Sequence, residues 1–411
     1  MSNQTYKRTE TVQITSLAIN GEDLREYLVA FNIYEDIFSN FLTCDITLAE
    51  HVSLTENVPI FGGETIVIGF NTHAADGNFD TITKAFICTG ISNLEVQPDI
   101  MGQKGRVYTI KGISVPAYVN LQKRVNRPYK DQRECQIVKD IATNVLGIGK
   151  LRLENCQFER NIILPNIRPS EAIQLLSRSA IRQGTKRICN YIFYEDMEKF
   201  NFVPLDFLIE QSEVNTVTNR VSRHVTNEEF AKLNAEYFAN SKNFDLVENI
   251  MSGMYGATSY GVNIGSKTYL NKNYIYTTEF PNQANIDGSN DELMDRPPSS
   301  PFQTLHVHPE EKRSYSEKRI DWNGVRRKML QQFKNNKYIV ETDGDTTIKV
   351  GDIVKFDLPS YDSTKDKDST VSQELDKYLS GKYLIIHLRH YVTREEHKMI
   401  MTLVKNQRLI N

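Results

Sequence analysis

The stretch VGDIVKFDL, residues 350–358, decides the fold, because an earlier part of the chain has almost the same design. On alternate positions Val354, Phe356 and Leu358 form an apolar face, and the positions between them form a mixed face. This alternation predicts a half-buried strand that follows a Gly-Asp turn.

The earlier copy is GGETIVIGF, residues 62–70. A Gly-Glu turn comes first, and Ile66, Ile68 and Phe70 then form the apolar face. Each copy is followed by a polar loop, a strand, a turn and a second strand. The pattern matches Ile87, Thr89 and Ile91 after the first copy with Leu384, Ile386 and Leu388 after the second.

Two explanations account for this repeated order of strands. Antiparallel strand triples are common, so coincidence is one of them. The interpretation that we favour is an internal duplication, which gives two related small β-barrels in one chain. The short strands and turn signals between residues 11 and 114 are typical of such a barrel or of a sandwich.

Helical spacing replaces strand alternation between the two copies. Residues 133–147 have apolar side chains at helical spacing, and residues 168–184 predict a second helix, with Pro169 near its start and Gly184 as its C-cap. A hairpin over residues 188–203 follows, so this part of the chain is expected to be an α+β lobe.

The predicted fold class is α+β, mainly β: two related small antiparallel β-barrels, an intervening α+β lobe and a small insertion. Residues 209–240 are polar and poorly patterned, and strands are expected again over 244–264 and 267–280. The expected domains are a first barrel over 1–114, the lobe over 115–208, a discontinuous second barrel over 209–280 and 326–411, and an insertion or small lobe over 281–325.

Composition limits the class of protein. A chain of 411 residues is expected to form two to four domains, and 39% hydrophobic with 25% charged residues is typical of globular proteins. A net charge of −3 argues against a dedicated nucleic-acid binder. No segment resembles a secretory signal or a membrane span. The five cysteines are scattered without a close pair, so a disulfide framework or zinc site is not expected: Cys44, Cys88, Cys135, Cys156 and Cys189.

Candidate phosphate and metal sites are weak. GVNIGSKT, residues 261–268, has three residues between its glycines where a Walker loop needs four, and Ser266 separates the second glycine from the lysine. His306 and His308 lack further ligands nearby, and strand alternation puts His387 and His390 on opposite faces. His397 is the third histidine of the last hairpin.

Other clusters have simpler interpretations. Gly147 in LGIGK is expected to end a helix. The acidic pair at 366–368 is expected to be solvated, and Arg326, Arg327 and Lys328 form the exposed face of a short helix unless they contact DNA or an acidic partner. We therefore predict no catalytic, cofactor-binding or metal residue, no cofactor and no enzymatic activity.

Four segments together resemble a known family. They are FNIYEDIFSNFLTCDITLAE with PIFGGETIVIGF, RPSEAIQLLSRSAI through NYIFYEDMEKFNFVPL, FDLVENIMSGMYG with YIYTTEF, and GKYLIIHLRHYVTREEHKMIMTLVKN. In this order, they resemble the baseplate central hub proteins of contractile-tailed bacteriophages, the T-even type of tail hub. No family pattern is visible over 281–314 and 360–381.

The resemblance implies a structural protein of the virion, assembled in the bacterial cytoplasm as a homotrimer. Its implied partners are a central spike protein, a tail tube or tube-initiator protein, baseplate wedge proteins and a tape-measure protein, with DNA only in transit. Two other classes remain open. One is the hub or spike of a type VI secretion or other contractile injection machine, and the other is a tail-associated hydrolase, for which no motif is present.

Overall fold

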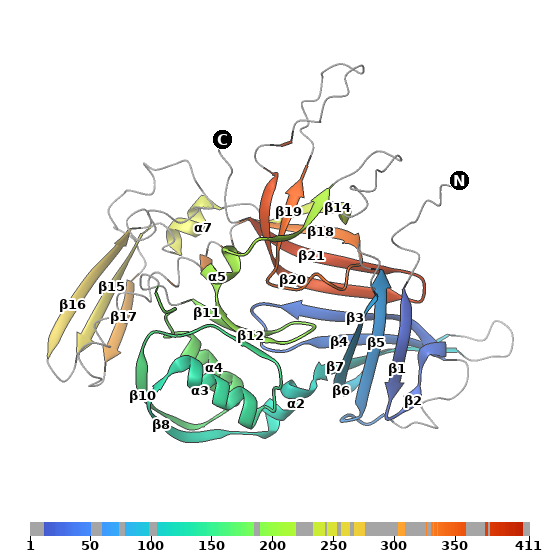
Figure 1. The fold of residues 1–411 in the computed structure, drawn as a ribbon, viewed down its shortest axis with the longest axis horizontal. Helices are drawn as coiled ribbons and strands as arrows, with labels where there is room; N and C mark the ends of the chain where they lie inside the picture. Colours follow the sequence, from blue (N-terminus) through green and yellow to red (C-terminus); the bar gives the residue numbers. More distant parts are fainter. Residues whose placement is uncertain are drawn as a thin grey trace, which may run out of the picture.

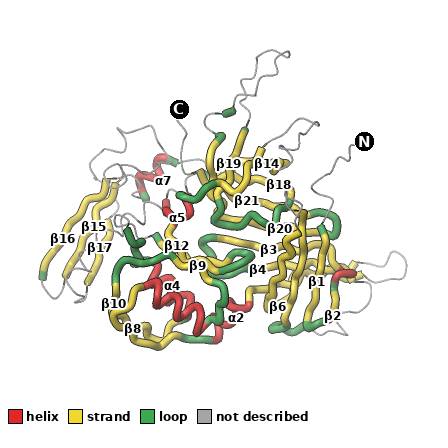
Figure 2. Tube along the Cα trace, viewed as in Figure 1, coloured by secondary structure: helices red, strands yellow, loops and turns green. Residues whose placement is uncertain are grey.

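The structure is a computed structural model of the 411-residue chain. Most of the chain is strand, with two barrels side by side, a lobe that holds the longer helices and a small separate sheet at one end (Figures 1 and 2). It describes residues 12–50, 60–73, 79–97, 105–184, 190–218, 233–242, 245–252, 256–263, 267–275, 303–308, 326, 330–331, 333–334, 336–358, 375–376 and 379–405.

The first barrel is an antiparallel sheet of six strands in the order β1-β5-β6-β7-β4-β3. Its apolar face is the predicted one, because Ile66, Ile68 and Phe70 are fully buried. The strands are β1 (Gln13–Ile19), β3 (Leu28–Asp36), β4 (Thr43–Glu50), β5 (Thr65–His73), β6 (Phe79–Gln97) and β7 (Gly105–Ser114); β2 (Glu22–Asp23) and the 3-10 turn η2 (Arg25–Tyr27) connect β1 to β3.

The second barrel has six strands in the order β19-β13-β14-β18-β21-β20, and a pairing of β19 with β20 closes it. Val354, Phe356 and Leu358 are buried as predicted, and Ile353 is buried too. The strands are β13 (Glu213–Thr218), β14 (Leu233–Lys242), β18 (Lys337–Asp343), β19 (Ile353–Asp357), β20 (Gly381–Thr393) and β21 (His397–Lys405).

One strand departs from the predicted antiparallel barrel. β13 runs parallel to both of its neighbours, β14 and β19. Both β13 and β14 come from the polar stretch in which the sequence predicted no strand. Their side chains are mostly exposed or half-buried, so the apolar alternation that marks the other strands is weak there.

Five strands of one barrel correspond to five of the other in the same spatial order. β3-β4-β7-β6-β5 matches β14-β18-β21-β20-β19, and every neighbouring pair in both sets is antiparallel. The register agrees as well, since Thr65 lies opposite Ile87 and Ile353 lies opposite Leu384. The two triples of strands matched in the sequence are therefore equivalent.

The turn before the matched strand is duplicated in its hydrogen bonds. Gly63 N donates to Cys88 O (2.8 Å), and Cys88 N donates to the carbonyl of the next residue, Glu64 (2.8 Å). Gly351 N donates to Ile385 O (2.9 Å), and Ile385 N donates to the carbonyl of Asp352 (3.0 Å). Both glycines have positive φ, 98° at Gly63 and 88° at Gly351, which glycine adopts without steric cost.

The side chain after each glycine also has the same role. Glu64 Oε1 accepts from the backbone N of Phe61 (2.7 Å), and Asp352 Oδ2 accepts from the backbone N of Lys349 (2.9 Å). In each case a carboxylate three residues later satisfies a turn N–H that the strand ladder leaves unpaired.

Two β-bulges are duplicated as well. The strand after the turn shifts register between Cys88 and Gly90 in β6 and between Ile385 and His387 in β20. The first long strand of each set shifts between Leu28 and Ala30 in β3, and between Ala235 and Tyr237 in β14. A shared bulge is an unlikely coincidence because it adds one residue at one defined place.

Burial differs at part of the matched face. Leu384, Ile386 and Leu388 are buried, whereas Thr89 is exposed and Ile91 is 39% exposed. The positions correspond as the sequence indicated, but their burial differs. The reason is that β3 covers the outer part of β20 but no described strand covers the same part of β6.

The lobe contains the two helices and the hairpin that the sequence predicted. α3 (Glu134–Asp140) continues into the π-helix η3 (Ile141–Val145), and Gly147 follows with the positive φ (74°) expected of a helix-ending glycine. The remaining elements are α2 (Val115–Gln122), β8 (Val125–Arg133), β9 (Leu151–Leu153), β10 (Glu159–Ile167), α4 (Pro169–Ser177), β11 (Tyr191–Glu195), β12 (Phe200–Pro204) and α5 (Leu205–Ile209).

The second lobe helix is shorter than predicted. α4 begins at Pro169 as expected but ends at Ser177, so Gly184 is not its C-cap, although Gly184 has a positive φ of 83°. The hydroxyls of Ser177 and Ser179 donate to the carbonyls of Gln174 and Leu176. Serine hydroxyls compete in this way with backbone bonds and favour the end of a helix.

A three-stranded sheet stands apart from the barrels at the left edge of Figure 1. It consists of β15 (Gly256–Asn263), β16 (Thr268–Ile275) and β17 (Gln303–His308), and it is preceded by the helix α7 (Leu246–Met251). The strand expected from residue 244 is therefore wrong over α7, where Asp245 Oδ1 accepts from Glu248 N (3.0 Å) as an N-cap.

No described helix has the length and apolar character needed to cross a membrane.

Candidate functional site

The two barrels join through a continuous strand pairing. β20 lies antiparallel to β3, from His387 opposite Asp36 to Thr393 opposite Ala30. This in-chain seam fuses the strands of both barrels into one 13-stranded sheet, and Figure 1 shows β3 directly beside β20. Because backbone hydrogen bonds run along the seam, the barrels are held in a fixed relation.

A buried polar chain lies inside the seam. Glu35 Oε1 is 2.9 Å from His390 Nε2, and His390 Nδ1 is 3.0 Å from His397 Nε2. All three side chains are at most 2% exposed. Burial, and then the neighbouring His390, lowers the pKa of His397 well below the ordinary histidine value, so His397 is neutral.

Glu35 connects three parts of the molecule. Its Oε2 accepts from the backbone N of Met197 (3.3 Å) in the lobe and of Val350 (3.4 Å) in the turn before β19. Among the described residues, no hydroxyl or thiol contacts His397 Nδ1, which has no hydrogen-bond partner. Through its contacts Glu35 links the first barrel to the lobe and to the second barrel.

The polar turn of the lobe hairpin reaches both barrels. Glu195 Oε2 accepts from Leu42 N (3.1 Å) in the first barrel, and Lys84 Nζ donates to Asp196 O (3.1 Å). Lys349 of the second barrel forms an ion pair with Glu198. The turn between β11 and β12 therefore contacts both barrels, and we call it the wedge. The sequence did not predict these contacts.

Charge is concentrated around this wedge. Burial is the main cause that raises the pKa of Asp352 to about 6, and the negative charge of Glu35 adds to it, although the hydrogen bond from Lys349 N opposes the rise. Burial likewise raises the pKa of Glu195, with Lys84 acting against it. These shifts follow from burial at the junction and do not indicate proton transfer to a substrate.

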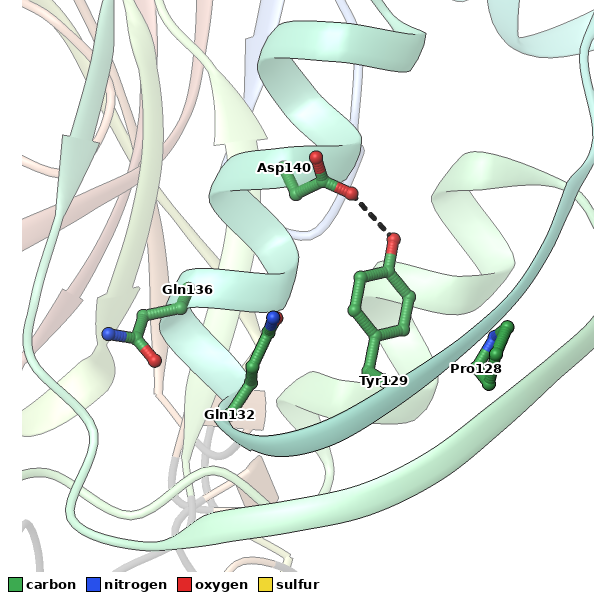
Figure 3. A pocket seen from close by; sticks show the side chains of 5 residues that line it. All are labelled: Pro128, Tyr129, Gln132, Gln136 and Asp140. Carbon is green, nitrogen blue, oxygen red and sulfur yellow. Dashed lines mark hydrogen bonds between the residues drawn. The ribbon is translucent and has the colours of Figure 1, made fainter.

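Two hollows in the described surface lack a catalytic set. One, of about 640 Å³, lies where the wedge meets both barrels, and its charged lining residues are Lys84, Lys150, Glu198 and Lys349. The other, of about 490 Å³, lies between β8 and α3, and Figure 3 shows Tyr129 Oη donating to Asp140 Oδ2 (2.7 Å) within it. Its remaining lining residues are Pro128, Gln132 and Gln136.

The histidines considered as metal ligands lie in different environments. His387 is half-exposed beside Asp36 (3.2 Å), and His390 is buried on the opposite face, as predicted. The contact of His390 with His397 was missed, because it depends on the register across the last hairpin. His306 and His308 lie in β17, and their side chains lie outside the described structure. Among the described residues, no group of three or more potential ligands is placed to hold a metal ion.

The basic run is only partly described, and its described member differs from the prediction. Arg326 Nη1 donates to the backbone carbonyls of Ser177 (3.0 Å) and Tyr191 (3.2 Å), so this half-buried arginine contacts the lobe and is not fully exposed. Arg327 and Lys328, the acidic pair at 366–368, and residues 264–266 of the glycine-lysine stretch lie outside the described residues.

The cysteines are closer than the sequence indicated. The fold brings Cys135 and Cys156 together, and Cys156 N donates to Cys135 Sγ (3.3 Å). Cys44, Cys88, Cys135 and Cys156 are all buried and free. The sequence separation of 21 residues hid this contact, which arises because the connection between β9 and β10 lies against the start of α3.

Comparisons with known proteins extend along almost the whole chain. No family model matches it. The probable baseplate hub protein gp334 of Vibrio phage KVP40 is 21% identical over 430 residues, covering 96% of this chain and 94% of that protein.

Two solved structures have a similar fold. A tail protein from Neisseria meningitidis MC58 has a TM-score of 0.56 at 12% identity, covering 96% of this chain and 97% of that one. The 43 kDa tail protein of prophage MuSo2 from Shewanella oneidensis has a TM-score of 0.55 at 9% identity, covering 96% and 98%. The resemblance of the sequence to the baseplate hub proteins of contractile-tailed phages is therefore confirmed by a relative named as a baseplate hub protein, and the fold is shared with two tail proteins.

Proposed function

We propose that the chain is the structural hub of a phage tail baseplate. In this proposal three copies form a ring with pseudo-six-fold symmetry, which joins the six-fold tail tube to the three-fold central spike. The observation that carries the proposal is the duplicated barrel, with the same strand order, turn and bulges in both halves of one chain.

The duplication gives such a ring its adaptor property. Three identical chains with two equivalent barrels each present six similar positions to a six-fold partner and three identical positions to a three-fold partner. The rigid in-chain seam and the buried Glu35 support this role, because an adaptor must keep its two barrels in a fixed relation.

The ring would surround an opening through which DNA passes. The net charge of −3 suits a channel that does not hold a polyanion. The proposed partners are the central spike protein, the tail tube or tube-initiator protein, the baseplate wedge proteins and the tape-measure protein, with the virion tail as the location. The named relative, a baseplate hub protein, supports this set.

Electron microscopy of the purified protein tests the proposal. In at least one of two conditions, the chain alone or with its spike protein, class averages should show a ring with three-fold symmetry, six barrel-sized densities and a central opening. Particles without an opening, or averages with two-fold symmetry, would contradict it. Adding the spike protein should place one density on the three-fold axis.

A further inference from the structure

Cys135 and Cys156 contact each other inside the lobe. The thiol of Cys156 donates a hydrogen bond to Cys135 Sγ, and the backbone N of Cys156 donates to the same sulfur (3.3 Å). Cys135 is 2% exposed and Cys156 is fully buried. The packing of the lobe therefore holds the two sulfurs against each other.

The contact makes the two thiols chemically different. The hydrogen bond from Cys156 is the main cause that lowers the pKa of Cys135 well below the ordinary cysteine value, against the effect of burial. The same hydrogen bond, followed by burial, raises the pKa of Cys156. Cys135 is thus the thiolate and Cys156 the thiol. Because the thiolate is the form that reacts with oxidants, Cys135 is the nucleophile of the pair and Cys156 is its resolving partner.

The first barrel contains two further buried cysteines that lack this arrangement. Cys44 on β4 and Cys88 on β6 both lie opposite Gly112 of β7, which separates them. Two strand spacings amount to about 9.5 Å, which is more than the roughly 7 Å between Cα atoms that a disulfide can span. Burial is the main cause that raises the pKa of both thiols. Cys44 and Cys88 therefore serve as an internal comparison with the same degree of burial.

The segment around Cys156 contacts other parts of the lobe. Gln157 N donates to Ile181 O (2.8 Å) in the stretch after α4, and Tyr191 Oη at the start of β11 donates to Asn155 O (2.9 Å). Cys135 is the second residue of α3. A bond between the two cysteines would therefore join α3 covalently to a segment that already contacts these two parts of the lobe.

We propose that Cys135 and Cys156 form a redox-convertible pair, which is reduced in the cytoplasm and closes to a disulfide when the protein meets a peroxide outside the cell. The chemistry of the pair stands without the proposed function, whereas the change of compartment rests on the proposed location in the virion. The sequence gave no sign of this site, because its two cysteines meet only in the folded lobe.

The proposed reaction has two steps. The Cys135 thiolate first attacks one oxygen of hydrogen peroxide, so that the O–O bond breaks, a sulfenic acid forms on Cys135 and hydroxide leaves. The Cys156 sulfur then attacks the sulfenic sulfur, an S–S bond forms, and the Cys156 proton leaves with the hydroxyl group as water. The two cysteines lose two electrons, and the peroxide, which the medium supplies, gains them.

The disulfide should stabilise the lobe. It would link residues that are 21 positions apart, and such a cross-link restricts the unfolded chain. The oxidised chain should therefore unfold at a higher temperature than the reduced chain.

Counting thiols on the folded protein tests the pair. The full chain carries Cys189→Ser, which leaves the four buried cysteines. Hydrogen peroxide is close to water in size and enters the lobe by local opening. After exposure in native buffer, the chain is unfolded in iodoacetamide and weighed. Two of the four thiols should be lost, and digestion should recover a bond between Cys135 and Cys156. Their loss should be at least about tenfold faster than that of Cys44 and Cys88, because a thiolate is the reactive form.

Two single variants separate the two steps. Cys156→Ser keeps a hydroxyl donor for Cys135, so the reaction should stop at the Cys135 sulfenic acid, which dimedone traps. Cys135→Ser leaves Cys156 as a buried thiol, which dimedone should label no faster than Cys44 or Cys88. Equal labelling in the two variants would overturn the assignment of Cys135 as the nucleophile.

The remaining outcomes separate the pair from the hub. Four free thiols after exposure, equal rates of loss at all four, or a bond that forms only in the unfolded chain overturns the pair. Native mass of the same samples reports on the hub. A trimer with four free thiols overturns the pair and leaves the hub standing. A chain that stays monomeric with its spike protein but forms the bond contradicts the hub and retains the pair.

Discussion

Phe356 and Lys355 are neighbours on β19 with opposite environments. Phe356 is fully buried and its ring packs 4.9 Å from that of Phe238, whereas the Lys355 side chain is 42% exposed beside Asp357. Replacing Phe356 with Glu leaves a buried, unpaired charge and a cavity, so it should lower the free energy of unfolding by about 3–5 kcal/mol.

Lys355→Glu is the matched variant, and solvent screening should keep its effect below about 1 kcal/mol. Denaturant unfolding measures both changes. Equal losses at the two positions would mean that the barrel interior lies on the other face of the strand.

Asp352 and Glu64 are equivalent carboxylates with opposite pKa shifts. Asp352 has a pKa of about 6, mainly through burial. Burial also raises the pKa of Glu64, but the N–H groups of Phe61 and Gly62 outweigh it, so this pKa is lowered overall. Between about pH 4 and 6, Asp352 is therefore protonated in the folded chain and ionised in the unfolded chain. This contribution to stability falls as pH rises.

Asp352→Asn keeps an acceptor for Lys349 N and removes the buried charge. It should raise the free energy of unfolding at pH 7 by on the order of 1–3 kcal/mol and give no gain at pH 4. Glu64→Gln should instead lower stability at pH 7, because the contribution of Glu64 is present above its unfolded pKa. Urea titrations at the two pH values measure both, and the same sign for both variants at pH 7 would contradict the account.

The glycine turns show how equivalent elements differ in their surroundings. A Cβ at Gly63 meets nothing within 4 Å, whereas a Cβ at Gly351 clashes with the hydroxyl of the buried Tyr194. Gly63→Ala should cost about 1–2 kcal/mol for the positive φ alone. Gly351→Ala should cost about 1–3 kcal/mol more, because Tyr194 must move within a packed core. Thermal unfolding measures the difference, and equal losses would remove Tyr194 from the explanation.

Strands with strong apolar alternation could be predicted from the sequence, and weakly patterned strands could not. β5 and β19 alternate clearly because one face of each lies in a barrel core. β13 and β14 are half-exposed, and a parallel strand inserted between two others leaves no local signal. α7 was missed because its six residues are too few for helical periodicity to appear.

The contacts at the junction between the two barrels could not be predicted from the sequence, for a different reason. Glu35 and His390 are 355 residues apart, and only the pairing of β3 with β20 brings them together. The polar turn around Asp196 was visible as a turn, but its role as a wedge depends on how the lobe packs between two barrels. Long-range polar contacts of this kind carry no periodicity.

The whole chain is expected to be inactive as a hydrolase. We predict this because the sequence carries no recognised hydrolase motif. Zymography of the purified protein should show no clearing. A clearing band that persists through further purification would contradict this expectation.

The number of copies in the assembled particle tests most directly whether the duplicated barrels serve a symmetry adaptor. Native mass spectrometry of the purified chain, alone and with its spike protein, measures this number. The account predicts three copies of the 47.3 kDa chain in at least one of the two conditions. A chain that stays monomeric with the spike present, or a particle of six copies, would contradict it.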